Sequence, residues 1–202
     1  MPRPDAPSAA RLLRPLQTDR LRLEPIRAAH ADAMFAGLHE PSLYAYQTDE
    51  PPHDLPELRD RYARLATGRS PSGDRFWLNW IVVPRETGAA AGYVQATVEL
   101  DLSLAVIGYL VLPAHQRRGF AGEATAAMVR HLAASGVRRF EAVVDVRNAA
   151  SLALIERLGF ERRETRRSDD VIAGSRGLDH VYVLKITEKG EAAGRGGSNP
   201  EG

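Results

Sequence analysis

The amino-acid sequence predicts an α/β (α+β) domain in which helices pack on a mixed sheet. Runs of strand-like alternation recur along the chain, and runs with helical apolar spacing separate several of them. Residues 104–112 are nearly all apolar, as in a strand covered on both faces. The order of the runs, β, α, α, β, β, β, α, β, α, β, β, fits a mixed sheet with helices on it. At 202 residues, 44% of them hydrophobic, the chain is long enough for one core and short for two.

The predicted elements begin with a strand and two helices. Residues 20–24 alternate between polar and apolar side chains, and residues 28–38 carry apolar side chains at mixed helical spacings. Residues 54–66 carry apolar side chains at more regular helical spacings, with Asp54 and Glu57 suited to a first turn. We therefore expect a strand followed by two helices.

Three strands and a longer helix follow. Residues 76–83 and 91–100 are strand-like runs on either side of a turn that contains proline and glycine. The apolar run at residues 104–112 is expected in the middle of the sheet. Residues 121–134 carry a helical apolar stripe and complete a strand, loop and helix sequence.

The last elements are short. Residues 140–146 return as a strand, and residues 151–158 form a short helix closed by Gly159. Two more strands are expected at residues 160–167 and 178–186.

The two ends of the chain differ in composition from the rest. Residues 1–15 are rich in Pro and Ala, and residues 188–202 contain a Gly-rich tract, so both are expected to be disordered around a domain at residues 16–187. The first residues lack the apolar run of a secretory signal, and no later segment is long enough to span a bilayer. A cytoplasmic location is therefore the default expectation.

Charge and cysteine content argue against several classes of function. The formal net charge is only +1 and the arginines lack interleaved aromatic residues, so nucleic acid is an unlikely partner. The chain has no cysteine, which excludes disulfides, thiolate metal ligands and a cysteinyl covalent intermediate. Any acyl transfer therefore uses another nucleophile or none.

The most informative segment is the loop at residues 116–122, Gln-Arg-Arg-Gly-Phe-Ala-Gly, between the apolar strand and the next helix. A helix start carries unpaired N–H groups and a positive dipole end, and glycine lets a phosphate approach the backbone closely. The spacing of Gly119 and Gly122 fits neither a P-loop nor a dinucleotide-binding fingerprint. The loop alone is compatible with a pyrophosphate site or with a tight strand-to-helix connection.

Together with a second region, this loop resembles a known family. Gln116-x-x-Gly119-x-Ala121 resembles the acetyl-CoA signature of the GNAT superfamily of N-acetyltransferases. Residues 145–151 (Asp-Val-Arg-Asn-Ala-Ala-Ser) and 155–160 (Ile-Glu-Arg-Leu-Gly-Phe) resemble its second signature region. Residues 18–25 and 107–109 are similar to the branch that acetylates the N-terminal alanine or serine of ribosomal proteins.

The resemblance implies a mostly antiparallel sheet of about seven strands flanked by about four helices. Two parallel strands, 104–112 and 140–146, are expected to splay apart around the pantetheine arm of acetyl-CoA, with its pyrophosphate on the loop amides. The residues predicted to bind acetyl-CoA are Leu110, Val111, Leu112, Gln116, Arg117, Arg118, Gly119, Phe120, Ala121, Gly122 and Asn148. For Asn148 an Asx turn before the helix is an equal alternative, and the two arginines are also compatible with solvated loop charges.

Direct aminolysis of a thioester needs an uncharged amine, support for an oxyanion and a proton for the thiolate, and it needs no metal. By resemblance, Ser151 is predicted to serve the thiolate, because Ile155 stands where many members have a tyrosine; a helix cap is the alternative role. Val106 replaces the acidic residue that commonly precedes Ile-Gly-Tyr, so Glu99 is predicted as the base. The other candidates for the base are Asp101 and His115.

These observations predict an N-acetyltransferase that moves acetyl from acetyl-CoA directly to a primary amine in a ternary complex. The acceptor is a protein N-terminus or a small-molecule amine, no membrane partner is expected, and the assembly is a monomer or a homodimer. The alternative is a non-catalytic acyl-CoA-binding regulatory module. Four aromatic residues could line an acceptor pocket or belong to the core: Tyr44, Tyr46, Trp77 and Trp80.

Overall fold

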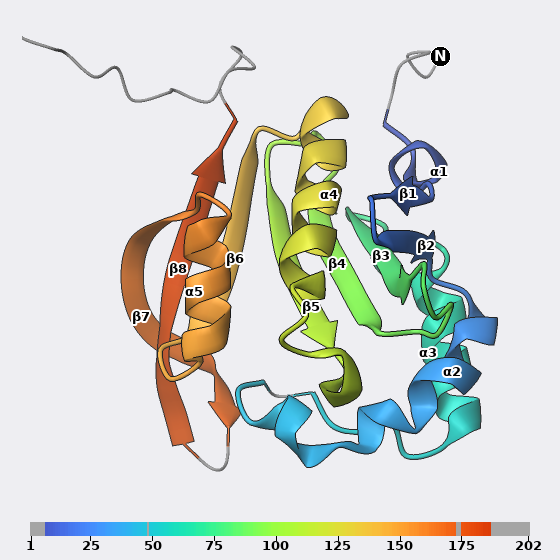
Figure 1. The fold of residues 1–202 in the computed structure, drawn as a ribbon. Helices are drawn as coiled ribbons and strands as arrows, with labels where there is room; N and C mark the ends of the chain where they lie inside the picture. The colour runs from blue at the N-terminus through green and yellow to red at the C-terminus, as the bar shows by residue number, and fades with distance from the viewer. Residues whose placement is uncertain (1–6, 48, 173–174, 187–202) are drawn as a thin grey trace, which may run out of the picture.

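The computed structural model describes residues 7–47, 49–172 and 175–186. One sheet of eight strands crosses it in the order β1-β2-β3-β4-β5-β6-β8-β7 (Figure 1). The strands are β1 (Leu16–Gln17), β2 (Leu21–Pro25), β3 (Arg75–Pro84), β4 (Gly92–Glu99), β5 (Ala105–Val111), β6 (Arg139–Asp145), β7 (Glu161–Ile172) and β8 (Ser175–Lys185). Every neighbouring pair except β5 and β6 is antiparallel. The predicted mixed and mostly antiparallel sheet is confirmed.

The helices pack on both faces of this sheet. They are α1 (Ala9–Leu12), α2 (Ala31–Phe35), α3 (Leu55–Leu65), α4 (Phe120–Ala134) and α5 (Ala149–Arg157), with single 3₁₀ turns η1 (Ala28–His30), η2 (Gly37–His39), η3 (Pro41–Tyr44) and η4 (Pro113–His115). No helix within the described ranges is long and apolar enough to cross a membrane.

Each face of the sheet has its own apolar cluster, because side chains alternate between the faces along every strand. On the face that carries α4 and α5, in front of the sheet in Figure 1, Trp80, Met128 and Phe140 are fully buried. On the opposite face, α2 and α3 pack against the sheet through residues such as Leu58 and Ile81. The two clusters leave the sheet covered on both sides near its centre.

The parallel pair of strands β5 and β6 is joined over a very short length. Only Ala105 with Phe140 and Val106 with Glu141 are in register. Beyond these residues the two strands diverge toward the end of β5, as Figure 1 shows. The predicted splay is therefore present, and it opens on the side of the molecule where α4 begins.

The N-terminal segment differs from the prediction. Residues 7–15, expected to be disordered, contain α1, and Leu12 is only 1% exposed in the core. The indole Nε1–H of Trp80 donates to the carbonyl of Arg14 at 2.8 Å. A Pro- and Ala-rich composition does not reveal that a single leucine anchors the segment. Residues 1–6 and the predicted tail at 188–202 lie outside the described part.

Two further differences concern element number and length. The sequence patterns do not predict α1 or the short β1, which supply the fifth helix and the eighth strand. The helix predicted at residues 28–38 is divided into η1, α2 and η2. Gly37, where η2 begins, packs closely against the residue after β5, since a Cβ there would lie 2.7 Å from a methyl group of Leu112.

The buried His131 ties the N-terminal segment to α4. Its Nε2–H donates to the carbonyl of Leu12 at 2.7 Å, and its Nδ1 accepts from Arg14 Nε at 3.4 Å. Burial lowers the pKa of His131, the Leu12 carbonyl partly opposes this shift, and the Arg14 charge adds to it. Folding therefore favours the neutral form of His131.

We predict that acid destabilises the fold through His131. Because its pKa is lower in the folded chain, the unfolded chain binds a proton first as the pH falls below about 6.5, and the stabilisation is lost below that pH. Urea unfolding at about pH 7.5 and about pH 5.5 should show a smaller acid-induced loss in His131→Gln than in the wild type. The control His53→Gln, at a side chain that is 91% exposed, should lose as much as the wild type. Equal losses in wild type and His131→Gln would contradict the prediction.

Candidate active site

A groove of about 580 Å³ runs between the end of β5, the start of α4 and the start of α5. We call it the α4 groove. Its lining includes nine of the eleven residues predicted to bind acetyl-CoA: Leu110, Val111, Gln116, Arg117, Gly119, Phe120, Ala121, Gly122 and Asn148. The structure therefore brings most of the predicted residues together in one wall, and residues that follow η3, such as Tyr46 and Gln47, complete it.

The loop that opens α4 has the backbone geometry of an anion site. Gly119 is the N-cap at φ 80°, a conformation that favours glycine. The first helical bond runs from Glu123 N–H to the Gly119 carbonyl at 3.1 Å, so the amides of Phe120, Ala121 and Gly122 have no partner within the helix. A Cβ at Gly122 would meet nothing within 4 Å. Free amides, the positive helix end and open space together fit a diphosphate group.

Arg20 holds this loop in place through contacts with Arg118 and Glu123. Its Nη1–H donates to the Arg118 carbonyl at 3.0 Å, and its Nη2 lies 2.5 Å from the Glu123 carboxylate. Thr18 Oγ1 donates to the same carboxylate at 2.5 Å. Burial raises the pKa of Glu123, but the hydrogen bonds from Thr18 and Arg20 outweigh this and hold it below its usual range. Sequence reasoning assigned no role to these residues, although Thr18 and Arg20 belong to the N-terminal motif that carried part of the resemblance.

Two predicted residues, Leu112 and Arg118, do not line the α4 groove. The Leu112 side chain is buried in the cluster beneath α2 and α3. The Arg118 guanidinium lies 4.7 Å from the centre of the Phe120 ring and 3.3 Å from the Glu86 carboxylate. The structure therefore favours the alternative in which Arg118 is an exposed loop charge.

The backbone of β5 shows which peptide groups face the splay. Leu112 N–H donates to the Ala91 carbonyl at 2.9 Å, and Glu99 N–H donates to the Leu104 carbonyl at 3.0 Å. Because hydrogen-bonded and non-bonded pairs alternate along an antiparallel ladder, the peptide groups of Leu110 also point toward β4.

The peptide groups of Tyr109 and Val111 point the other way, into the gap beside β6. The Val111 carbonyl accepts a hydrogen bond there from the Gln116 side chain at 3.0 Å. The prediction that Leu112 binds acetyl-CoA therefore needs correction, since its amide is bonded within the sheet and its side chain is buried in the other cluster. Of the three strand residues predicted to bind acetyl-CoA, only Val111 directs its peptide groups into the gap.

Asn148, Ser151 and Tyr109 meet at the start of α5. The Asn148 side-chain oxygen accepts from the Ser151 amide at 3.1 Å, so Asn148 is the helix cap and Ser151 is not. The Ser151 hydroxyl instead shares a hydrogen bond of 2.5 Å with the Tyr109 hydroxyl. Burial raises the pKa of Tyr109, and the hydrogen bond to Ser151 only partly opposes this. Ile155, where a tyrosine is common, is fully buried in the core.

A second cavity of about 320 Å³ occupies the splay itself. Tyr109 and Asn148 line both this splay cavity and the α4 groove, and Ser151 lines the splay cavity. Three further residues of its lining come from the other face of the sheet: Asp49, Tyr93 and Gln95. The splay is therefore a passage through the sheet.

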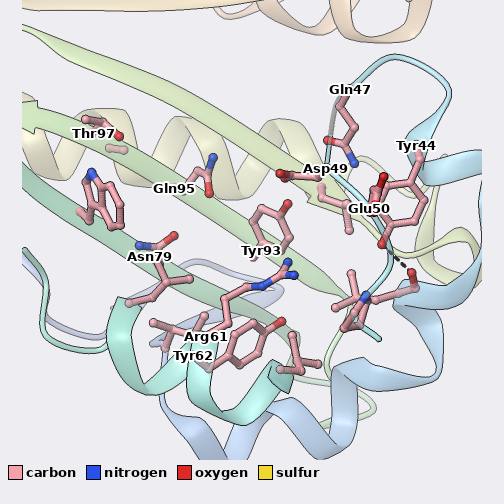
Figure 2. A pocket seen from close by; sticks show the side chains of 18 residues that line it. Tyr44, Gln47, Asp49, Glu50, Arg61, Tyr62, Asn79, Tyr93, Gln95 and Thr97 are labelled. Atoms are coloured by element: carbon pink, nitrogen blue, oxygen red, sulfur yellow. Dashed lines mark hydrogen bonds between the residues drawn. The ribbon is translucent and has the colours of Figure 1, made fainter. Parts of the chain in front are cut away.

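A third cavity of about 420 Å³ lies beneath α3 on that other face. We call it the α3 cavity. Tyr93, Gln95, Asp49 and Gln47 line both it and the splay cavity. Figure 2 shows its polar side chains, with the Asp49 carboxylate directed toward the Tyr93 hydroxyl. Of the four aromatic residues considered, Tyr44 and Trp77 line this cavity, Tyr46 lines the other two, and Trp80 is core.

Glu99 does not reach these cavities. It forms an ion pair with Arg75 at 3.3 Å, near the end of β4 where β5 and β6 are still paired. Four residues separate it from Gln95, which corresponds to about 13 Å along a strand. His115 does line the α4 groove, and its buried Nδ1 has no hydrogen-bond partner within the described residues. The carboxylate that sequence reasoning missed is Asp49, whose loop position carries no local signal.

Comparison with known families decides the relationship of this chain. A family model described as an acetyltransferase (GNAT) domain matches residues 20–161. The chain belongs to the GNAT acetyltransferase family. A curated GNAT-like relative, an uncharacterized N-acetyltransferase YoaA of Bacillus subtilis (strain 168), is 28% identical over 149 residues, which cover 73% of this chain and 82% of the relative.

Solved structures of the GNAT family share the fold. The RimL ribosomal L7/L12 alpha-N-protein acetyltransferase, in complex with coenzyme A, has a TM-score of 0.76 at 20% identity and covers 86% of this chain and 98% of its own. The microcin C7 self-immunity acetyltransferase MccE, in complex with acetyl-CoA and AMP, has a TM-score of 0.74 at 17% identity, covering 84% and 94%. A probable acetyltransferase from Chromobacterium violaceum has a TM-score of 0.72 at 24% identity, covering 89% and 87%.

We predict that Gly119→Glu blocks binding of acetyl-CoA. It adds negative charge beside the loop amides, and its Cβ would lie 3.3 Å from Arg20 Nη2, so it also disturbs the residue that holds the loop in place. The matched control is Gly73→Glu, since Gly73 has a similar φ of 74° and open space around it but lies outside the groove. Each substitution should lower stability by about 1 to 2 kcal/mol through the strained backbone. Calorimetric titration should show acetyl-CoA affinity reduced at least about 10-fold only in Gly119→Glu. Wild-type affinity in a folded Gly119→Glu variant would remove the loop from the site.

Proposed function

We propose that this GNAT protein transfers an acetyl group from acetyl-CoA directly to a primary amine while both substrates are bound. The observation that carries this proposal is the series of three cavities with shared lining residues, from the α4 groove through the splay to the α3 cavity. A donor on one face of the sheet can then meet an acceptor on the other. Such an arrangement suits a ternary complex and needs no covalent acyl-enzyme.

The proposed donor site uses backbone groups more than side chains. The amides of Phe120, Ala121 and Gly122 would hold the pyrophosphate, and the Val111 peptide group would pair with the pantetheine arm. Arg20 and Glu123 hold the loop in place without entering the groove. The thioester supplies an activated acetyl group, which these contacts direct toward the splay.

We propose that Ser151 and Tyr109 together protonate the departing sulfur. The Ser151 hydroxyl donates a proton to the thiolate as the carbon–sulfur bond breaks, and it accepts one from the Tyr109 phenol 2.5 Å away. Because burial raises its pKa, Tyr109 stays protonated at neutral pH and can refill from solvent. The phenol of Tyr109, on β5, would thus supply the proton that an apolar side chain at Ile155 cannot supply.

We propose Asp49 as the group that receives the acceptor amine. It lines both the splay cavity and the α3 cavity, whereas Asp145 is held by Arg147 at 2.6 Å. The Asp49 carboxylate would bind the ammonium form and first take one proton from it to solvent, which frees the nitrogen lone pair for attack. The second proton leaves the nitrogen for solvent once the carbon–nitrogen bond has formed, and solvent returns one proton to Tyr109. Removing this first proton is easier for an amine with a pKa of about 8 than for one of about 10.4.

A panel of amines and peptide N-termini, with CoA release as the signal, tests the proposed function. We expect steady release with at least one class of small amine or with a peptide N-terminus. If acetyl-CoA binds and none of these acceptors gives release above the blank, the transferase proposal fails and an acyl-CoA-binding module takes its place.

We predict that Ser151→Ala and Tyr109→Phe each lower kcat about 100-fold, because each interrupts the proton path to the sulfur. The double variant should be little worse than either single variant, since the two hydroxyls act in series. Steady-state kinetics should show a nearly unchanged KM for acetyl-CoA. Tyr182→Phe, which removes a phenol bonded to Glu156 outside the three cavities, should keep the wild-type kcat. Independent effects that multiply in the double variant would argue against the paired role.

A further inference from the structure

The α3 cavity carries one cation among its aromatic side chains. Arg61 projects from α3, and its Nη2–H donates to the Glu57 carboxylate at 3.0 Å. A guanidinium has five N–H donors, so this bond leaves others for a ligand. Burial raises the pKa values of Tyr62 and Tyr93, and the Arg61 charge partly opposes both shifts. The guanidinium therefore lies near both phenols, as Figure 2 also shows.

Tyr62 presents an unusual hydroxyl in the same cavity. The residue is 4% exposed, and its buried hydroxyl has no hydrogen-bond partner among the described residues. The neighbouring Tyr44 differs, because its hydroxyl donates to the Leu38 carbonyl at 2.5 Å. A buried polar group without a partner costs stability, and such groups are uncommon unless a ligand or water pairs with them. Because the Tyr62 phenol is neutral, its O–H can donate a hydrogen bond to an acceptor oxygen of a ligand.

The opposite wall of the cavity is acidic. Asp49 and Glu50 line it, and Asp49 also borders the splay, where transfer is proposed to occur. The remaining wall is largely apolar, with Leu58, Leu65 and Trp77 among its residues. A volume of about 420 Å³ falls within the usual range for small-molecule sites.

We infer that the acceptor is a small zwitterionic amine, whose carboxylate binds Arg61 and Tyr62 while its amine lies beside Asp49. Its body is apolar, to match the walls between these two ends. This inference rests on the proposed function. It favours a free amino carboxylate over a polyamine, which would lack a partner for Arg61.

The first test compares acceptors that differ only in the carboxylate. A set of α- and ω-amino carboxylates of increasing length is assayed for CoA release beside the corresponding carboxamides. The carboxylates should have kcat/KM values about 10- to 100-fold higher than their amides, as for loss of a charge-assisted hydrogen bond. If none of the acceptors gives CoA release above the blank, both the proposed function and this inference are overturned. Release with amides, polyamines or peptide N-termini at equal or better efficiency overturns only the inference.

The second test uses variants of the two proposed carboxylate ligands. Arg61→Gln should erase the preference for carboxylate over amide by raising KM for the carboxylate, with little change in kcat for the amide. Arg64→Gln is the matched control, since Arg64 is exposed on the same helix and does not line the cavity. An unchanged preference in Arg61→Gln overturns the inference.

Tyr62→Phe separates a binding role from a structural one. Loss of an unpaired buried hydroxyl should leave the melting temperature unchanged or raise it. The same variant should lower kcat/KM for the carboxylate about 3- to 10-fold, and by less for the amide, whose carbonyl oxygen is a weaker acceptor. Calorimetric titration of the preferred carboxylate against the protein without acetyl-CoA provides a readout independent of turnover. Equal kinetics and affinity in wild type and Tyr62→Phe would remove Tyr62 from the site.

Discussion

Beyond Val106, the main-chain groups of β5 that face β6 no longer have a strand opposite them. Peptide groups inside a sheet are rarely left without partners. The early separation of β5 and β6 is therefore the constraint on which the cavities at the centre of the molecule depend. The separation allows side chains from both faces of the sheet to line one passage. It also leaves the Tyr109 and Val111 peptide groups available to an extended ligand.

The start of α4 depends on the same separation. A helix packed across a closed sheet would bury its N-terminal amides, whereas here the amides after Gly119 line an open groove. Arg20 and Glu123 hold the loop without lining the groove, so the charged side chains support the loop geometry and the backbone amides form the proposed anion site. Of the two loop arginines, Arg117 lines the groove and Arg118 does not.

The two faces of the sheet differ in what they present to the passage. The α4 face presents backbone donors and the Tyr109–Ser151 hydroxyl pair. The α3 face presents a cavity lined by the carboxylates of Asp49 and Glu50 and by Arg61. A donor with phosphate groups suits the first face, and a small amine suits the second. The opposed chemistry is consistent with direct transfer between them.

Local patterns in the sequence determined the order of the main strands and helices and the glycine loop at the start of α4. These features depend on side-chain periodicity and on backbone conformations that neighbouring residues impose, so they can be recognised within a short window. The splay of β5 and β6 was implied by the resemblance of two short segments to the GNAT family. The cap at Asn148 is also a local feature, because it joins residues only three positions apart, and it was one of the two roles considered for Asn148. The tail at residues 188–202 lies outside the described part of the chain.

Only the tertiary structure decided which distant groups meet. Glu99 was near the site in sequence, but strand geometry carries it to the paired end of β4, while Asp49 arrives from a loop far along the chain. The pairing of Tyr109 with Ser151 and the burial of Leu12 likewise join residues from separate elements. The sequence determined the elements and the nature of the donor site because both are local. The proposed acid pair, the carboxylate proposed to bind the amine and the α3 cavity depend on packing between elements, which no single stretch of residues encodes.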